Sequence, residues 1–187
     1  VSAPPRGAGR PPARASVLRG RSMAELPSCL DGVSKKQLLG EEVLFLKSRG
    51  IDDEACAAIA PLLGANTALR QLYIGYNSFG DEGTRQLCQA LATAQDGGLQ
   101  LLGLRHCQLG DGAAEALADL LRGNATITEV GCDENEIGDA GAEALAAALG
   151  ENMTLRHLYI GDNRITEVGR GRLLESKPAG LQIHFDR

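Results

Sequence analysis

Apolar residues recur along the chain with two different spacings. Leu72 and Ile74 alternate with Tyr73, and this period of two predicts a short strand. Further along, Leu87 and Leu91 are separated by one helical turn in a polar and Ala-containing stretch, which predicts the apolar face of a helix. The chain therefore predicts alternating short strands and helices.

The strand pattern repeats at a nearly constant interval. Almost the same six residues, LYIGYN and LYIGDN, stand at 72–77 and 158–163. A period of about 20–50 residues is typical of stacked repeat units. Successive equivalent positions are 28, 30, 28 and 28 residues apart and hold Leu44, Leu72, Leu102, Val130 and Leu158.

Polar residues between strands and helices predict how each unit turns. Aspartates stand where helices should begin, and we expect them to cap the helix N-termini, because an Asp side chain accepts bonds from the first free amides. Asparagines follow three of the helices, where we expect a left-handed backbone. The aspartates are Asp53, Asp81, Asp111 and Asp139, and the asparagines are Asn66, Asn124 and Asn152.

One strand–helix unit cannot bury its apolar side alone, whereas stacked units can. We therefore expect an α/β solenoid of about five repeats over residues 41–187, with parallel strands on a concave face and helices on the convex face. Residues 23–40 are expected to cap the stack at its N-terminal end. The segment 181–186 is expected to add a closing strand with Ile183 and Phe185 facing inward.

Each unit has the form LxxLxLxx(N/C)x(I/L), followed by a polar turn such as GDEG or GDAG and an Ala-Leu helix. Over about residues 39–187 this pattern resembles the leucine-rich repeat of the ribonuclease-inhibitor-like type. The resemblance implies that the Asn or Cys of each unit bonds the backbone of the turn after the strand and is structural. Arg49 departs from that pattern, so the first unit is expected to be a degenerate cap. The other units place Asn77, Cys107, Asn135 and Asn163 there.

The N-terminal leader, residues 1–22, differs in composition from the rest. It holds five arginines, four prolines and no acidic residue, so we expect it to be disordered. An organelle transit peptide has such a composition. The alternatives are an extension before a true start at Met23, or a fragment of a longer chain.

Charge and cysteine usage narrow the classes of partner. Residues 23–187 hold 14 Lys or Arg against 24 Asp or Glu, which sums to −10. This acidic body argues against nucleic acid and is compatible with another protein that has a basic surface. No stretch reaches the ~18 consecutive apolar residues of a membrane span, so no membrane partner is expected. Five cysteines without a CxxC pair favour reduced thiols and a cytoplasmic location, or an organelle if the leader is a transit peptide.

The sequence offers no catalytic constellation. It contains no phosphate-binding loop, nucleophile elbow or zinc-ligand spacing. His106 and His157 are expected at solvent-facing positions, and Cys132 is expected to pack as a small apolar residue. We therefore expect no enzymatic activity, no metal and no cofactor.

The side chains that point out of the strands form the candidate binding site. At the centre of the strands, two glycines, Gly103 and Gly131, stand between Tyr73 and Tyr159. Tyrosine is enriched at interface hot spots, and the glycines would let a partner approach the backbone. An ordinary solvated face is the alternative. The further members of the site, acidic in the later units, are Tyr76, Arg105, Glu129, Asp133, Glu134 and Asp162.

These features favour a non-enzymatic protein-interaction module or scaffold that binds its partner on the concave face, as a monomer or as part of a larger assembly. Repeats of this type occur in nucleotide-binding immune receptors. The chain is also similar in repeat type to Ran GTPase-activating proteins and to the repeat domain of tropomodulins. The resemblance therefore leaves a regulator of a small GTPase or of actin as the alternative.

The leader should contribute nothing to stability, because no apolar periodicity connects it to the repeats. A chain that starts at Met23 should give the same thermal melting curve as the full chain. A clearly lower melting temperature for the shorter chain would show that residues 1–22 dock on the repeats.

Overall fold

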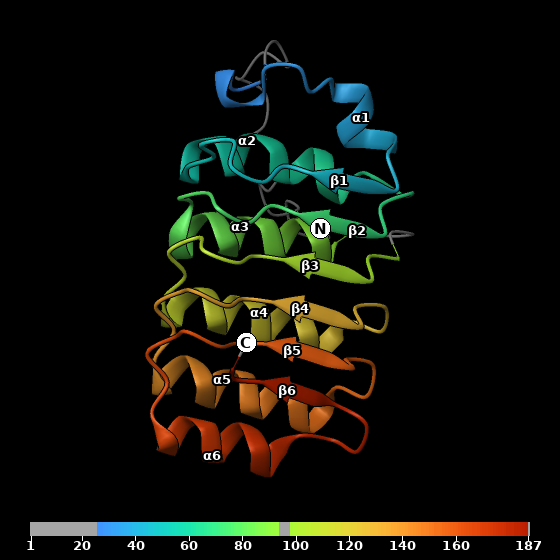
Figure 1. Ribbon diagram of the computed structural model, residues 1–187. Coiled ribbons are helices and arrows are strands. Elements are labelled where there is room, and N and C mark those ends of the chain that lie inside the picture. The colour runs from blue at the N-terminus through green and yellow to red at the C-terminus, as the bar shows by residue number, and fades with distance from the viewer. Residues whose placement is uncertain (1–25, 94–97, 187) are drawn as a thin grey trace, which may run out of the picture.

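Parallel strands form one layer of the molecule, and helices form a second layer behind it (Figure 1). The computed structural model describes residues 26–93 and 98–186, so the expected leader, residues 1–22, lies outside the described residues. Within the described part, six strands form one sheet in the order β1-β2-β3-β4-β5-β6, and each strand pairs in parallel with the next. The predicted α/β solenoid of about five repeats is confirmed.

Strands and helices alternate regularly after a short helical entry. The entry consists of η1 (Ser28–Leu30) and α1 (Lys35–Gly40). The strands are β1 (Val43–Phe45), β2 (Gln71–Tyr73), β3 (Leu101–Gly103), β4 (Glu129–Gly131), β5 (His157–Tyr159) and β6 (Gln182–His184). The helices between them are α2 (Asp53–Gly64), α3 (Gly80–Ala92), α4 (Asp111–Gly123), α5 (Asp139–Glu151) and α6 (Glu167–Ser176).

The strand register follows the spacing of the repeats. Leu72 pairs with Leu44 on one side and with Leu102 on the other, and the same column continues to β6. The closing strand expected within 181–186 is present as β6, where Ile183 continues the inward column and packs against the core together with Phe185. One inward residue per repeat therefore lies directly above its counterpart in the next repeat.

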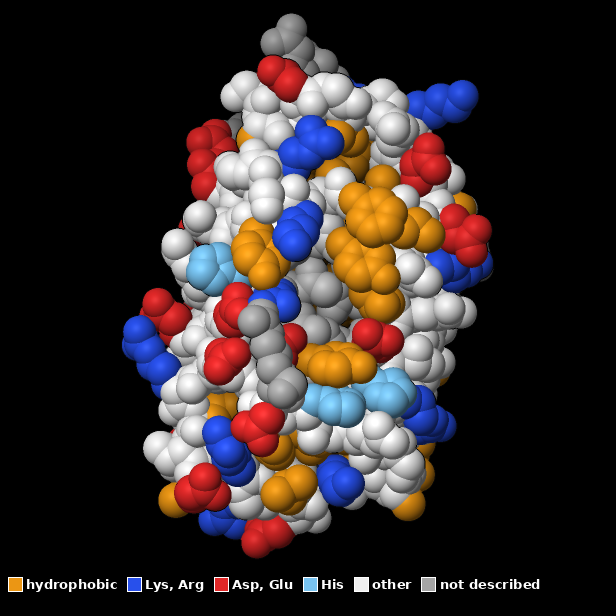
Figure 2. All heavy atoms as spheres, viewed as in Figure 1, with side chains coloured by type: hydrophobic (Ala, Val, Ile, Leu, Met, Phe, Trp, Pro, Cys, Tyr) orange, Lys and Arg blue, Asp and Glu red, His pale blue; other side chains and the backbone are white. Residues whose placement is uncertain are grey.

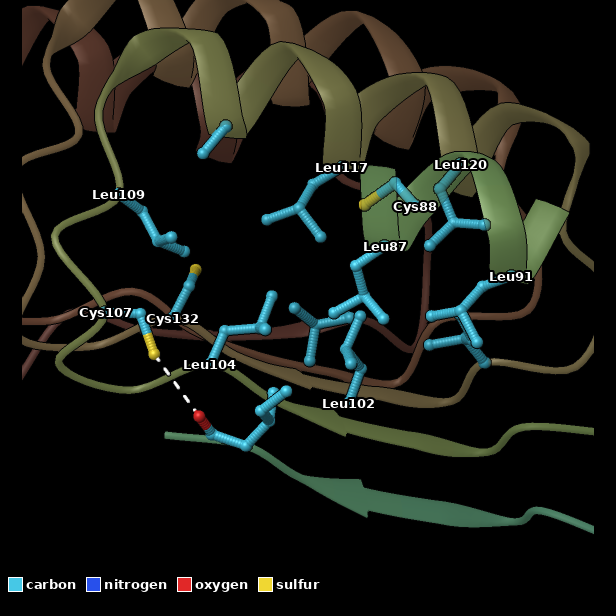
Figure 3. Packing of buried hydrophobic residues seen from close by; sticks show 14 of the residues in the cluster. Leu87, Cys88, Leu91, Leu102, Leu104, Cys107, Leu109, Leu117, Leu120 and Cys132 are labelled. Atoms are coloured by element: carbon cyan, nitrogen blue, oxygen red, sulfur yellow. Dashed lines mark hydrogen bonds between the residues drawn. The ribbon is translucent and has the colours of Figure 1, made fainter. Parts of the chain in front are cut away.

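The core lies between the two layers. Leu102 and Leu104 project from the β3 region toward Leu87 of α3 and Leu117 of α4, and all four side chains are fully buried (Figure 3). The helices also pack closely against one another, since a Cβ added at Gly141 would lie 2.8 Å from Cβ of Ala114. Small residues on the helices therefore let the repeats approach each other while leucines fill the space above the sheet.

Asparagine side chains connect each repeat to the one before it. Oδ1 of Asn135 accepts bonds from the amides of Cys107 at 2.8 Å and Leu109 at 3.1 Å, and its Nδ2 donates to the carbonyl of Leu104 at 3.0 Å. Asn77 and Asn163 make equivalent bonds. Cys107, at the equivalent position, has no side-chain amide, and its Sγ instead contacts the carbonyl of Ile74 at 3.6 Å, the dashed line in Figure 3.

The expectation that four aspartates cap their own helices is wrong. Helix α2 is capped by Asp52, whose side chain accepts the amide of Ala55, while Asp53 is already the first helical residue. Each predicted aspartate instead reaches the start of the next helix, as when Oδ1 of Asp111 accepts the amides of Gly138 and Gly141. The first amides of a helix have no partner within that helix, so a carboxylate from the previous repeat satisfies them and complements the helix dipole. Asp53, Asp81 and Asp139 make the corresponding bonds.

The expectation of a left-handed backbone at the asparagines that follow the helices is also wrong. Asn124 and Asn152 have φ of −94° and −85°. These residues act through their side chains: Nδ2 of the buried Asn152 donates to the carbonyls of Leu121 and Asn124, while its Oδ1 accepts two amides ahead of β5. Asn66 does the same and thereby ties α2 to the carbonyl of Leu38 in α1.

Replacing Leu102 by Ala should reduce the free energy of unfolding by about 2–5 kcal/mol, because the deleted atoms leave a cavity in a packed layer. Leu102 is 0% exposed. Urea unfolding of the two proteins measures the difference. A loss below about 1 kcal/mol would contradict the inward position of this side chain.

Replacing Asn135 by Ala should cost at least about 2 kcal/mol, because it leaves two buried amides without their acceptor. The neighbouring Glu136→Ala is the matched control. The side chain of Glu136 forms an exposed ion pair with Arg164, so its loss should change stability by less than about 1 kcal/mol. Equal destabilisation by the two substitutions would refute the role given to Asn135.

Candidate functional site

The outward side chains of the strands make up the strand face, which is the side of the molecule seen in Figure 2. By register, the central outward positions of neighbouring strands form one column. Tyr73, Gly103, Gly131 and Tyr159 therefore lie side by side on β2 to β5, in the order expected from the sequence.

The two tyrosines stack away from each other. The ring of Tyr73 lies parallel to that of Phe45 on β1, with centroids 5.0 Å apart and planes at 6°. The ring of Tyr159 stacks on His184 of β6, with centroids 4.4 Å apart and planes at 11°. Each tyrosine is thus held by an aromatic neighbour on its outer side, which leaves the two glycines between them.

The glycines of the column are not equally open. A Cβ at Gly103 would lie 3.3 Å from Cδ1 of Tyr73, so that ring borders Gly103. At Gly131 the nearest atom to such a Cβ is Oδ2 of Asp133, at 3.9 Å. Among the described residues, Gly131 is therefore the more open of the two glycines, and it lies between the Tyr73 and Tyr159 stacks.

The glycines that end the two LYIG segments, Gly75 and Gly161, have a role different from that of Gly103 and Gly131. A Cβ at Gly75 would lie 2.7 Å from the carbonyl oxygen of Arg105, and one at Gly161 would lie 2.7 Å from that of Phe185. Both glycines are buried under the backbone of the following repeat. The duplicated LYIG sequence therefore combines an outward tyrosine with a backbone position at which the next repeat comes very close.

The residue before the Asn or Cys position of each repeat has a left-handed backbone. Tyr76, Glu134 and Asp162 have φ of 58°, 54° and 50°, and Ser48 and His106 are similar. A positive φ is uncommon for residues other than glycine, and here it turns the chain so that the following Asn or Cys enters the interior. This turn places the side chains of Tyr76, Glu134 and Asp162 along one margin of the strand face.

Cations surround Tyr76. Nζ of Lys47 lies 4.1 Å from the centre of the Tyr76 ring, and the guanidinium of Arg105 lies 5.5 Å from it. The ring also stacks on His106, with centroids 5.3 Å apart. The N-terminal half of the strand face therefore combines aromatic rings with positive charge.

The acidic members of the site lie in the C-terminal half, as expected. Nη2 of Arg105 and Oε1 of Glu134 form an ion pair at 2.5 Å, so Glu134 is partly neutralised. Glu129 and Asp133 stand two residues to either side of Gly131 along the chain, and alternation in a strand directs them to the same face. Carboxylates therefore flank the open glycine, and Asp162 adds an exposed one on the next repeat.

Asp133 is the half-buried carboxylate nearest to Gly131. Burial raises its pKa, while a hydrogen bond from the amide of Gly161, at 3.2 Å, acts in the opposite direction. The positive charge of Arg105 lowers this pKa, and the negative charge of Asp162 raises it. A cation placed at Gly131 would stabilise the ionised form of Asp133.

Phe45, Lys47 and His184 were not among the residues predicted for the site. Phe45 is 68% exposed and forms half of the first aromatic stack. The alignment of repeats already places Phe45 in the Tyr73 column and Lys47 in the Arg105 column. If the alignment is extended to the closing strand, so that Ile183 is equivalent to Leu158, it also places His184 beside Tyr159.

The cysteines of the core are poorly suited to act as nucleophiles or metal ligands. Burial raises the pKa of Cys56 and Cys88 to about 12 and that of Cys107 to about 11. It also raises the pKa of the fully buried Cys132. Because the thiolate is the reactive form, these thiols are inert packing groups near neutral pH. Within the described ranges, no three His, Cys, Asp or Glu residues are grouped to hold a metal ion.

The repeats match a known family. The family described as Leucine Rich repeat matches residues 65–88, 99–118, 123–146 and 151–173. Together with the stacked strand–helix units, these matches show that the chain belongs to the leucine-rich repeat proteins. Its repeats are of the ribonuclease-inhibitor-like type, as its relatives indicate.

Two such relatives are similar over half of the chain. The ribonuclease inhibitor of Sus scrofa is 33% identical over 95 residues, which are 50% of this chain and 20% of that protein. The NACHT, LRR and PYD domains-containing protein 12 of Homo sapiens is 35% identical over 95 residues, which are 50% of this chain and 9% of that protein. The chain thus matches a fifth or less of the length of these relatives.

Solved structures share the fold. Actin-binding site 2 of leiomodin-1 has a TM-score of 0.64 at 18% identity, over 80% of this chain and 87% of that one. The tropomodulin C-terminal domain of Caenorhabditis elegans has a TM-score of 0.57 at 18% identity, over 80% and 89%. At this identity the similarity concerns the fold alone. Among the helices that the structure describes, none has the length and apolar character needed to cross a bilayer.

Proposed function

We propose that this protein is a non-enzymatic interaction module that binds another protein through the strand face. The observation that carries the proposal is the open backbone at Gly131, which lies between two aromatic stacks and is flanked by the carboxylates of Glu129 and Asp133. Rigid rings with polar tips and an accessible backbone suit a protein partner.

The partner that fits this surface presents a Lys or Arg side chain. Such a side chain would extend over Gly131, contact the ring of Tyr159 and place its charge near Asp133. The cation would stabilise a carboxylate whose pKa is raised by burial. Charge complementarity would mainly speed association, so binding should weaken as salt concentration rises.

The free cysteines of the described chain favour a reducing compartment, and we place the protein in the cytoplasm. The structure of leiomodin-1 with the same fold is an actin-binding site by its description, so actin is one partner to be tested. Affinity capture with the full chain, followed by titration of the recovered partner, identifies the ligand.

Gly131→Arg should block binding by bulk and by occupying the position of the partner's cation. The matched control is Gly150→Arg, at an exposed position in α5 where an added Cβ meets no atom within 4 Å. Titration by calorimetry should show loss of binding for the first variant and parental affinity for the second. If only the helix-side variant abolishes binding, the binding site lies on the convex face.

Tyr159→Ala should weaken binding by at least about 1 kcal/mol if the ring is a hot spot. The fold should persist, because this side chain points away from the core. Circular dichroism verifies the fold, and the same titration measures affinity. Parental affinity of Tyr159→Ala would remove this ring from the interface.

Affinity should fall as the pH is lowered through the pKa of Asp133. Burial raises that pKa, so the carboxyl takes up its proton at a higher pH than an exposed Asp would, and the neutral form no longer attracts the partner's cation. Asp133→Asn should lower the affinity at neutral pH and flatten this part of the pH profile. An unchanged pH profile in this variant would show that another group is responsible.

A further inference from the structure

The strand face carries a pair of histidines from two different repeats. His157 lies on β5 and His184 on β6, and they are two of the three histidines of the whole chain. Nδ1 of His157 and Nε2 of His184 are 3.5 Å apart, and both side chains are partly exposed. In Figure 2 two histidine side chains lie side by side on this face, next to a hydrophobic ring.

We propose that these two nitrogens bind a divalent transition-metal ion, with Zn²⁺ as the representative case. Two nitrogens bound to one tetrahedral Zn²⁺ at about 2.0–2.1 Å each lie about 3.4 Å apart. The observed separation of 3.5 Å matches this spacing. The ring centroids are 5.8 Å apart, so the two nitrogens face each other, and both rings must turn for their lone pairs to converge on one ion. In the metal-free protein the two nitrogens are within hydrogen-bond distance of each other, and the ion would replace that contact.

Neighbouring side chains hold the two rings in this arrangement. The His157 and His184 rings are nearly parallel, at 22°, and both stack against Tyr159, at 19° and 11°. A metal ion would therefore meet two imidazoles that are already held close together, which lowers the entropic cost of binding. The acidic half of the strand face, with Glu129 next to His157 by register, favours a cation electrostatically.

The site supplies two protein ligands. Among the described residues, no third His, Cys, Asp or Glu joins the pair. Water fills the remaining coordination positions, and these positions point toward the solvent side of the strand face. The ion would therefore connect the last strand to its neighbour, and a partner's His or carboxylate could complete the coordination.

Zinc titration of the untagged full chain by calorimetry tests the proposal without any partner. We expect one ion per chain, and we expect His157→Gln and His184→Gln each to weaken binding by about tenfold or more, since each removes one of two ligands. His106→Gln is the matched control, because His106 is the remaining histidine and should leave the affinity unchanged.

A second measurement separates metal binding from a loss of fold. Zinc should raise the melting temperature of the parent and of His106→Gln, because an ion that binds only the folded chain stabilises it, and it should not raise that of the two other variants. Cys29→Ser tests the one cysteine that is not buried. Parental zinc affinity in His157→Gln or His184→Gln, or loss of binding in Cys29→Ser, would overturn the assignment.

Discussion

The amide side chains of buried asparagines join consecutive repeats at the turns that follow the strands. Each turn after a strand exposes amides and carbonyls that no helix or sheet can pair, and leaving them buried without partners would be costly. Asn135 accepts two amides of the previous repeat and donates to its carbonyls. Aspartates accept amides of the next repeat at the helix starts, as Asp111 does for α5. These bonds join residues 26 to 31 positions apart, so residues about one repeat apart in the sequence lie next to each other in the structure.

The same constraint shapes the binding surface. For each Asn or Cys to enter the interior, the residue before it must adopt a left-handed backbone, and this places Tyr76, Glu134 and Asp162 at the margin of the strand face. Because each strand pairs with the equivalent residues of the next repeat, the outward residues then line up in columns. Aromatic stacks form where neighbours in a column are large, as with Phe45 and Tyr73, and the backbone stays open where the residue is Gly131. The surface is thus a direct product of the repeat register.

Membership of the leucine-rich repeat family accounts for the scaffold, while the partner depends on outward residues that the scaffold leaves free to vary. Leiomodin-1 shares the fold at 18% identity, which is why the fold says little about the ligand. The strand face of this chain carries two aromatic stacks, cations around Tyr76, acids around Gly131 and a histidine pair at the last two strands.

The repeat boundaries, the inward Leu column and the order of Tyr73, Gly103, Gly131 and Tyr159 follow from the sequence, because the strand period, the helix period and the 28-residue spacing can be counted along the chain. It predicted wrongly that Asp111 caps its own helix and that Asn152 has a left-handed backbone, since residue preference alone does not reveal which repeat a side chain bonds. The stacking of Tyr159 on His184 and the closeness of His157 to His184 were decided only by the tertiary structure. They depend on side-chain orientations across neighbouring strands, and a count of residues along the chain does not contain that information.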